Sequence, residues 1–224
     1  MEGYRTAMIR RAIVMAADAH RNQVRKEKQI PFISHPLGVA LRISLMRRPK
    51  PTDDLICAAI LHDTREDTEL SAWAIRKEFG PEVLRIVLAC TEPSKSLAWE
   101  ERKFRMIRRM KRAPMDVLIL CCTDKIDNLQ SIQDSLSAEG LKTAKEFKEA
   151  KTWKSFNRGY GSQKWYFQEI TKAIFANVPT KDLPPIFGTL MRLVEHIFGE
   201  EIILDKKIRH KVKAYAKKTQ YRSP

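Results

Sequence analysis

Apolar residues recur along most of the chain at three- and four-residue spacing, the period of an amphipathic α-helix. In the first such segment, residues 4–21, the apolar positions are Met8, Ile9, Ala12, Ile13, Ala16 and Ala19. Further segments of this kind lie at residues 163–176, 185–198 and 202–218. Strand-like alternation of apolar and polar residues does not stand out, and the 224 residues include only 8 glycines. The pattern therefore predicts an all-α fold.

Capping residues place several helix starts. The segment Ser34-His35-Pro36 is typical of a helix N-terminus, because serine can cap and proline is tolerated in the first turn. His35 should then lie at the mouth of a helix. Ser71 is expected to start a short helix that Gly80 ends, and Pro81 to begin the next one.

The most informative polar residues follow an apolar segment that Thr52 is expected to open as a helix. His62 and Asp63 end this segment, and an adjacent imidazole and carboxylate can bind one divalent metal ion. If the helix continues, Glu66 and Asp67 lie one turn further along on the same side. Such crowding of polar groups costs stability unless a cation binds there.

A second set of polar residues follows the most apolar run of the chain, Val117–Cys122. This run is expected to form a buried helix, yet it leads directly to Asp124, with Asn128 one turn further on. Together with His35 and the His62-Asp63 pair, Asp124 gives imidazole and carboxylate groups from three helices. Such donors suit Mn²⁺, Fe²⁺ or Mg²⁺ better than a thiolate zinc site. Because a bound ion can acidify water and polarise a phosphoryl oxygen, the set indicates phosphoester hydrolysis.

The same residues resemble the HD-domain phosphohydrolases and, within them, the RelA/SpoT-type alarmone hydrolases. The resemblance extends over roughly residues 4–175. The segments that carry it, in family order, are Ile33-Ser34-His35-Pro36, Ala58–Thr64 with Glu66-Asp67-Thr68, Phe79–Val83, Glu101-Arg102-Lys103, and Asp124-Lys125 with Asn128. We expect an HD-domain helical bundle over residues 1–178 and a helical extension with a basic tail over residues 179–224.

The resemblance implies a role for individual positions. The implied metal ligands, usually for Mn²⁺, are His35, His62, Asp63 and Asp124. The implied acid pair, which orients or deprotonates the attacking water, is Glu66 and Asp67. The candidate substrate contacts are Arg25, Lys26, Lys28, Asn128 and, as a stacking aromatic, Trp165. In this family the reaction releases pyrophosphate from the 3′ position of guanosine tetra- or pentaphosphate, giving GDP or GTP.

Three features depart from the family pattern. Arg65 stands where a small apolar residue is common, Asp127 replaces a usual His or Tyr, and the loop Arg25–Ile30 is slightly short. None removes a predicted ligand, so the departures bear on substrate identity more than on catalysis. Open alternatives are an adenosine analogue of the alarmone, the 2′-phosphate of NADPH, and an antitoxin-like role that destroys the product of an alarmone-making toxin.

Charge adds a further alternative. The net charge of +15 predicts attraction to anions, either a polyphosphorylated nucleotide or nucleic acid. The most basic segments are the predicted helix Trp99–Arg112 and the tail after Leu204, so a nucleic-acid-binding HD protein is a competing hypothesis. The four cysteines lie in apolar runs without CxxC spacing, and no run is long enough to span a membrane. We expect a cytoplasmic protein without a membrane partner, and the sequence does not predict an oligomeric state.

Overall fold

The computed structural model describes residues 2–25, 30–176 and 178–220, with side chains described from residue 6 to residue 214 within those ranges. In this part of the chain the fold is all-α, which confirms the predicted fold class, and the β-structure consists of one isolated bridge between Val24 and Pro31. The elements in chain order are α1 (Glu2–Ala19), α2 (Ser34–Ser44), α3 (Asp53–Leu61), α4 (Thr64–Asp67), α5 (Ala72–Cys90), α6 (Trp99–Met110), α7 (Met115–Ala138), α8 (Ala144–Phe147), η1 (Lys151–Ser155), α9 (Tyr160–Phe175), η2 (Thr180–Asp182), α10 (Pro185–Phe198) and α11 (Lys206–Gln220).

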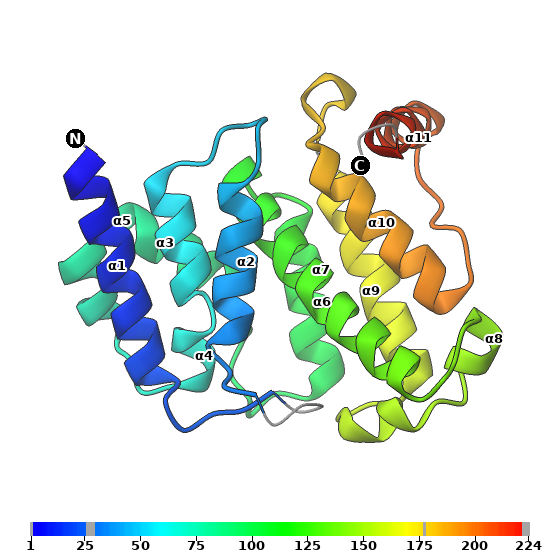
Figure 1. Ribbon diagram of the computed structural model, residues 1–224, viewed down its shortest axis with the longest axis horizontal. Helices are drawn as coiled ribbons and strands as arrows, with labels where there is room; N and C mark the ends of the chain where they lie inside the picture. The colour runs from blue at the N-terminus through cyan, green and yellow to red at the C-terminus, as the bar shows by residue number, and fades with distance from the viewer. Residues whose placement is uncertain (1, 26–29, 177, 221–224) are drawn as a thin grey trace.

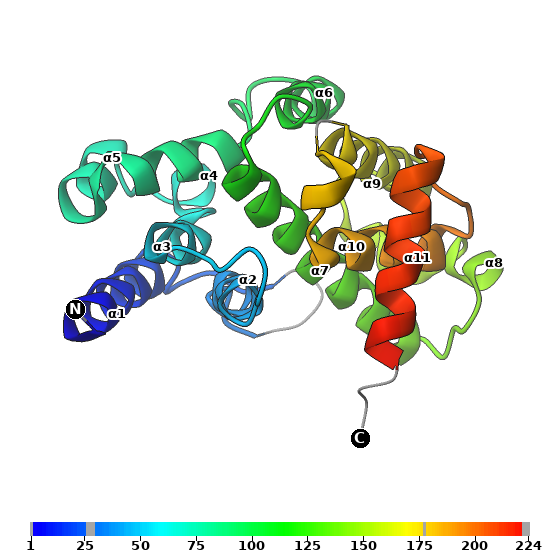
Figure 2. The same cartoon turned by 90° about the horizontal axis from the view of Figure 1, so that it is seen from above.

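Two helices form the centre of the bundle. α3 packs against α1, α2 and α5, and α7 packs against α2, α5, α9 and α10 (Figure 1). Every residue from Leu55 to Leu61 is buried, as is every residue from Val117 to Thr123, so neither segment has a polar face. The amphipathic helices surround these two. α6 packs on α9 and forms one outer edge of the molecule (Figure 2).

The apolar helix that Thr52 opens ends directly before the His62-Asp63 pair. α3 ends at Leu61, and the one-turn helix α4 begins at Thr64. The Thr64 hydroxyl donates to the Leu61 carbonyl at 2.7 Å, which compensates a carbonyl at the end of α3. His62 and Asp63 keep right-handed helical φ and ψ angles between the two helices, and Glu66 and Asp67 lie on the separate short helix α4.

The predicted break at Gly80 is confirmed. Gly80 lies inside α5 with φ 86° and ψ 174°, so the segment consists of two helices joined at a kink, with Pro81 starting the second. This combination of angles is open almost only to glycine. The kink lets one continuous segment pack against both α3 and α7.

The C-terminal helices share the main core. Phe187, Leu190 and Val194 of α10 are buried in the same cluster as α7 and α9, so packing does not mark a separate unit after residue 178. The boundary there stays a prediction. α11 starts at Lys206, four residues later than expected, and Val212 packs over Gly188 of α10. None of the described helices combines the length and apolar character needed to cross a membrane.

We expect Gly80→Ala to lower the free energy of unfolding by about 1–3 kcal/mol, because an added Cβ makes the positive φ strained even though it meets no atom within 4 Å. Gly161→Ala, in the first turn of α9, is the matched control: its added Cβ also meets nothing within 4 Å, and its φ is not in the strained range. Its effect should stay below about 1 kcal/mol. Urea denaturation measures both changes, and an equal loss in the two variants would contradict the strain argument.

Candidate metal centre and substrate cleft

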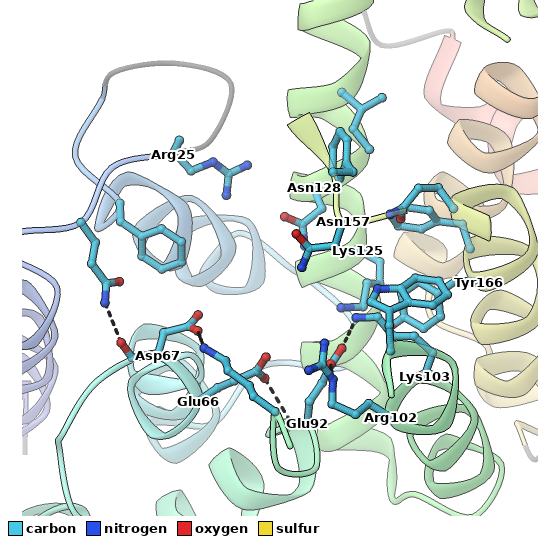
Figure 3. A pocket seen from close by; sticks show the side chains of 18 of the residues that line it. Arg25, Glu66, Asp67, Glu92, Arg102, Lys103, Lys125, Asn128, Asn157 and Tyr166 are labelled. Atoms are coloured by element: carbon cyan, nitrogen blue, oxygen red, sulfur yellow. Dashed lines mark hydrogen bonds and ion pairs between the residues drawn. The ribbon is translucent and has the colours of Figure 1, made fainter. Parts of the chain in front are cut away.

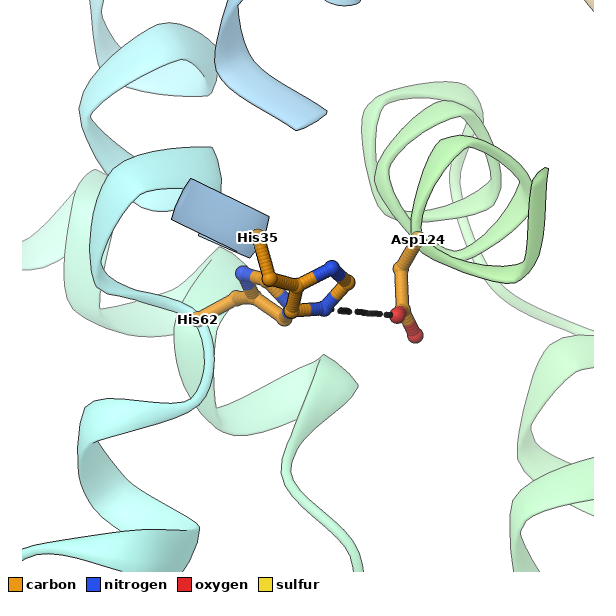
Figure 4. Close-up of side chains that lie close together, drawn as sticks. All are labelled: His35, His62 and Asp124. Carbon is orange, nitrogen blue, oxygen red and sulfur yellow. Dashed lines mark ion pairs between the residues drawn. The ribbon is translucent and has the colours of Figure 1, made fainter. Parts of the chain in front are cut away.

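Two histidines and an aspartate meet where α2, α3 and α7 approach one another. His35 is the second residue of α2, His62 directly follows α3, and Asp124 lies within α7. One nitrogen or oxygen atom of each lies within 4.8 Å of those of the other two. Figure 4 shows the three side chains converging on one point. Residues far apart in the sequence therefore supply one potential metal site.

Asp63 lies beside this cluster. Its Oδ2 is 3.4 Å from His35 Nε2, and its Oδ1 is 3.2 Å from His62 Nε2. Asp124 Oδ1 is 3.3 Å from His35 Nε2 and 3.9 Å from His62 Nε2. Each imidazole Nε2 therefore faces two carboxylates, and the four residues predicted from the sequence lie together.

The opposite ring nitrogens fix the orientation of both imidazoles. His35 Nδ1 lies 2.6 Å from Asp127 Oδ2, and His62 Nδ1 lies 2.8 Å from the Ala59 carbonyl oxygen. With Nδ1 carrying the proton, Nε2 of each ring is left as a lone-pair donor toward the cluster. His62 Nε2 is buried and makes no hydrogen bond within the described residues. A buried nitrogen without a partner, beside two carboxylates, fits a divalent metal ion.

Electrostatics favour a cation at the same point. Burial alone would raise the pKa of the Asp124 carboxyl, but the charge of Lys125 and the neighbouring histidines hold it well below its usual range. Burial alone would lower the pKa of His35, but hydrogen bonds with Asp124 and Asp127 and the charge of Asp63 raise it to about 9. The carboxylates thus hold a positive charge at His35, and a metal ion that binds there displaces a proton.

Asp127 contacts His35 at Nδ1, the ring nitrogen opposite the one that faces the cluster. In addition to its contact with His35 Nδ1, its Oδ2 lies 3.6 Å from Arg25 Nη2. A Cβ at Gly38 would lie 3.0 Å from Asp127 Oδ1, so the glycine leaves the space that this carboxylate occupies. The sequence marked Asp127 only as a departure from the family pattern. Its position three residues after Asp124 on one helix face was the available signal.

The acid pair of α4 lies next to the cluster. Glu66 Oε2 accepts a hydrogen bond of 3.0 Å from the Glu92 backbone N–H. Burial, followed by the charges of Glu92 and Asp63, raises the pKa of Glu66 to about 7. Asp67 accepts a hydrogen bond of 2.6 Å from Lys95 Nζ. Glu66 can therefore exchange a proton near neutral pH, whereas Asp67 is paired with a cation.

Gln23 holds α4 in place. Its Nε2 donates a 2.6 Å hydrogen bond to the Asp67 carbonyl, and its Oε1 lies 2.8 Å from His20 Nδ1. His20 is buried, with its ring centroid 4.8 Å from that of Phe32. His20 therefore belongs to the support of the acid pair rather than to the metal cluster.

A cleft of about 690 Å³ opens in front of the acid pair. It lies between α4 on one side and α6, α7 and α9 on the other (Figure 3). Its cationic lining residues are Arg25, Lys95, Arg102, Lys103 and Lys125. Its acidic lining residues are Glu66, Asp67 and Glu92, and its aromatic ones are Phe32, Trp99, Phe156, Tyr166 and Phe167.

The wall facing the acid pair combines cations with an aromatic ring. Lys103 Nζ lies 4.6 Å and Lys125 Nζ 5.7 Å from the centre of the Tyr166 ring, and Lys103 also contacts Glu92. The Tyr166 hydroxyl is buried without a hydrogen bond in the described residues, whereas Arg102 Nε forms an ion pair with Glu92 Oε2 at 3.4 Å. An unused hydroxyl donor beside ammonium groups suits the oxygens of a phosphorylated ligand. Lys103 and Lys125 belong to segments that carry the family resemblance, but the sequence does not predict that they form one wall with Tyr166, because only the fold brings the three together.

The predicted substrate contacts have different positions. Arg25 and Asn128 both line the cleft, and Asn128 Nδ2 donates to Asp124 Oδ1 at 2.6 Å. Trp165 does not line it; its ring lies 6.2 Å from that of Trp99 and is 38% exposed, while the adjacent Tyr166 faces the cleft. Lys26 and Lys28 lie outside the described residues.

Comparison with known proteins identifies relatives. The sequence profile of the HD domain matches residues 12–154. The Drosophila melanogaster guanosine-3′,5′-bis(diphosphate) 3′-pyrophosphohydrolase MESH1 is 34% identical over 135 residues, which is 59% of this chain and 74% of the relative. The residues that match the HD-domain profile include the candidate metal ligands and the acid pair.

Two solved structures are also similar. A Listeria monocytogenes protein, lmo0812, superimposes with a TM-score of 0.64 at 38% identity, covering 74% of this chain and 99% of its own. A metazoan ortholog of SpoT, described as hydrolysing ppGpp, has a TM-score of 0.57 at 21% identity and covers 95% of this chain and 96% of its own. The second likeness shows a shared fold.

We expect Asp127→Asn to weaken Mn²⁺ binding by about 10–100-fold, because the amide keeps the shape but loses the charge that orients His35. Asp18→Asn is a matched control, since Asp18 forms only an exposed ion pair with Arg21. Isothermal titration calorimetry with Mn²⁺ measures both variants. Unchanged Mn²⁺ affinity in Asp127→Asn would remove Asp127 from the support of the site.

Proposed function

The chain belongs to the HD-domain family, and we propose that it is a metal-dependent hydrolase that releases pyrophosphate from the 3′ position of guanosine tetra- or pentaphosphate, giving GDP or GTP. The observation that carries this proposal is that the half-buried Glu66, whose pKa is raised partly by the charge of Asp63, lines a cation-rich cleft next to the His35–His62–Asp124 cluster. The named activity of its MESH1 relative supports the same reaction.

In this proposal His35, His62, Asp63 and Asp124 hold one divalent ion. The bound ion supplies a Lewis acid that polarises the 3′-phosphoryl group and acidifies water. Imidazole and carboxylate donors are compatible with Mn²⁺, Fe²⁺ or Mg²⁺, and we propose Mn²⁺ on the strength of the family resemblance. Asp124 remains an anionic ligand throughout, because Lys125 and the histidines keep its pKa low.

Glu66 is the proposed general base. Its carboxylate, fixed by the Glu92 backbone N–H, accepts a proton from the water that attacks the 3′-phosphorus, and Asp67 orients that water. The bond that forms joins the water oxygen to phosphorus, and the bond that breaks joins phosphorus to the ribose 3′ oxygen. The proton that Glu66 accepts is proposed to pass to the leaving 3′ oxygen, so the products are pyrophosphate and a nucleotide with a free 3′-hydroxyl.

The cationic wall is proposed to bind the phosphates. Lys103 and Lys125 supply ammonium groups, and the unused Tyr166 hydroxyl can donate to a phosphate oxygen. Arg25 and Asn128 lie nearer the metal cluster and are proposed to contact the scissile pyrophosphate and the ribose. Arg25 also contacts Asp127, so a substrate bound at Arg25 would lie close to the carboxylate that orients His35.

Other substrates and other roles are alternatives that separate experiments distinguish from the proposed reaction. An adenosine alarmone and the 2′-phosphate of NADPH carry similar charge, so the same cleft could accept them. The proposed location is the cytoplasm, where such nucleotides occur. Action as an antitoxin would follow from hydrolysis and requires the intact metal site. The basic composition also suggests a nucleic acid partner, and the surface that favours this partner lies on α6, separate from the cleft.

We expect the Mn²⁺-loaded protein to release pyrophosphate from guanosine tetraphosphate and to act more slowly on the adenosine analogue and on NADPH. Chromatographic analysis of products from the three nucleotides measures this order. Release of inorganic phosphate from NADPH as the dominant reaction, without pyrophosphate release from either alarmone, would contradict the proposed substrate.

Glu66→Gln should lower kcat by about 10²–10⁴-fold while Mn²⁺ remains bound, because the amide cannot accept the proton and Glu66 is not a ligand. The control is Glu69→Gln, on the nearby loop outside the cleft lining. Metal analysis and steady-state kinetics are measured on both. A Glu66→Gln protein with unchanged turnover would exclude this carboxylate as the base.

The same carboxylate predicts a pH dependence. A base works when ionised, so kcat/KM should rise with pH through an apparent pKa at or below the value of about 7 that burial gives Glu66, since a bound cation lowers it. Measurements at saturating Mn²⁺ separate this limb from loss of metal. An alarmone hydrolase whose kcat/KM is flat between pH 5 and pH 8 would contradict a raised pKa at Glu66.

A further inference from the structure

Helix α6 has two different faces. Trp99, Met106, Ile107 and Met110 are buried, and Arg102 and Lys103 line the cleft. The exposed side carries Arg105, Arg108 and Arg109, and Arg112 follows in the turn after Met110, where α6 ends. Their i, i+3, i+4 and i+7 spacing brings the guanidinium groups together as a stripe. None of these four arginines is among the described residues that line the substrate cleft.

The stripe borders a surface hollow of about 750 Å³ between α6, the end of α5 and the start of α7. Phe104 also lines this hollow, and its side chain is 55% exposed. The floor is apolar, formed by Ala89, Ala113 and Pro114. α6 lies at the outer edge of the molecule in Figure 2, so this surface is open to a macromolecular partner.

The arginines are not equivalent. Arg105 forms an exposed ion pair with Glu101 at 2.6 Å, and Arg109 donates to the carbonyls of Leu88, Ala89 and Thr91 at the end of α5. For Arg108 and Arg112 the described residues include no ion-pair partner within 4.0 Å. Arg108 and Arg112 therefore have no ion pair to hold them there, and they share one surface hollow with the exposed ring of Phe104.

We propose that this surface, formed by Phe104, Arg105 and Arg108 of α6 and by Arg112 shortly after it, binds single-stranded nucleic acid. Guanidinium groups contact phosphates in a planar, often bidentate manner, and an exposed aromatic ring stacks on an unpaired base. A duplex would leave the ring without a base to stack on. A lipid surface fits less well, because the apolar side of α6 is buried in the protein and is not available for insertion.

The inference does not depend on the proposed hydrolytic function. The hollow and the cleft share no lining residue among those described, so substitutions of Phe104, Arg108 or Arg112 leave the cleft lining intact. The two activities can therefore fail separately.

Fluorescence anisotropy with a labelled single-stranded RNA of about 12 nucleotides at low salt tests the site. The double variant Arg108→Gln/Arg112→Gln should weaken binding about tenfold or more and reduce the salt dependence by about two phosphate contacts. Phe104→Ala should weaken binding about fivefold or more while the salt dependence stays unchanged.

The matched control is Lys206→Gln/Lys207→Gln, which removes the same charge from exposed positions on α11. It should bind RNA nearly as well as the unmodified protein. An equal loss in the control would show attraction to net charge alone and would overturn the proposal. So would absence of RNA binding at low salt, or tighter binding of a duplex or of anionic lipid vesicles through the same residues. Thermal melting of each variant confirms that it is folded.

Discussion

The structure depends on the compensation of carboxylates buried between apolar helices. Asp124 lies within α7, directly after its buried segment Val117–Thr123, and an ionised group there is costly unless opposite charge and hydrogen bonds surround it. Lys125, Asn128 and the two histidines provide that compensation. Because these partners come from α2, α3 and α7, the requirement fixes how the helices meet. The metal centre and the packing of the bundle are one arrangement.

α7 connects the candidate metal centre with the cleft. Asp124, Asp127 and Asn128 are at i, i+3 and i+4 spacing, so one side of the helix carries a candidate ligand, the carboxylate that contacts the candidate ligand His35, and a cleft residue. Asp127 also approaches Arg25 from the N-terminal part of the chain. A shift of α7 would therefore disturb metal binding and the cleft together. This rigidity suits a site that must hold a cation and a polyanion a few ångströms apart.

The sequence predicted the features that depend on local pattern. The helices that carry His35 and Asp124, the kink at Gly80 and the all-α class follow from capping residues and periodicity, and the ligand set came from residue type together with the family resemblance. The apolar helix is expected to run into the His62-Asp63 pair, and α3 ends at Leu61, directly before it. The sequence leaves open whether the helix continues to Glu66 and Asp67, because an apolar helix followed by polar residues has the same sequence pattern with or without a break. α8 and η1 were missed because they are short.

The cleft wall could not be predicted for a different reason. Lys103, Lys125 and Tyr166 are distant in the sequence and meet only through the packing of α6 and α7 on α9. Each taken alone is typical of a surface or core position. Trp165 and Tyr166 show the limit well: both are aromatic and adjacent, and only the rotation of α9 decides that Tyr166 faces the cleft.

The distribution of charge distinguishes two explanations of the basic composition. The described lining of the cleft has five cationic and three acidic side chains, so the cleft accounts for little of the net charge of +15. Binding of a small polyanionic substrate in the cleft therefore does not explain the large excess of positive charge on the whole chain. The remaining positive charge lies outside the cleft, and on α6 it is ordered into an arginine stripe beside an exposed ring. Solubility requires net charge but no alignment of arginines. The aligned stripe therefore fits a second, extended anionic ligand.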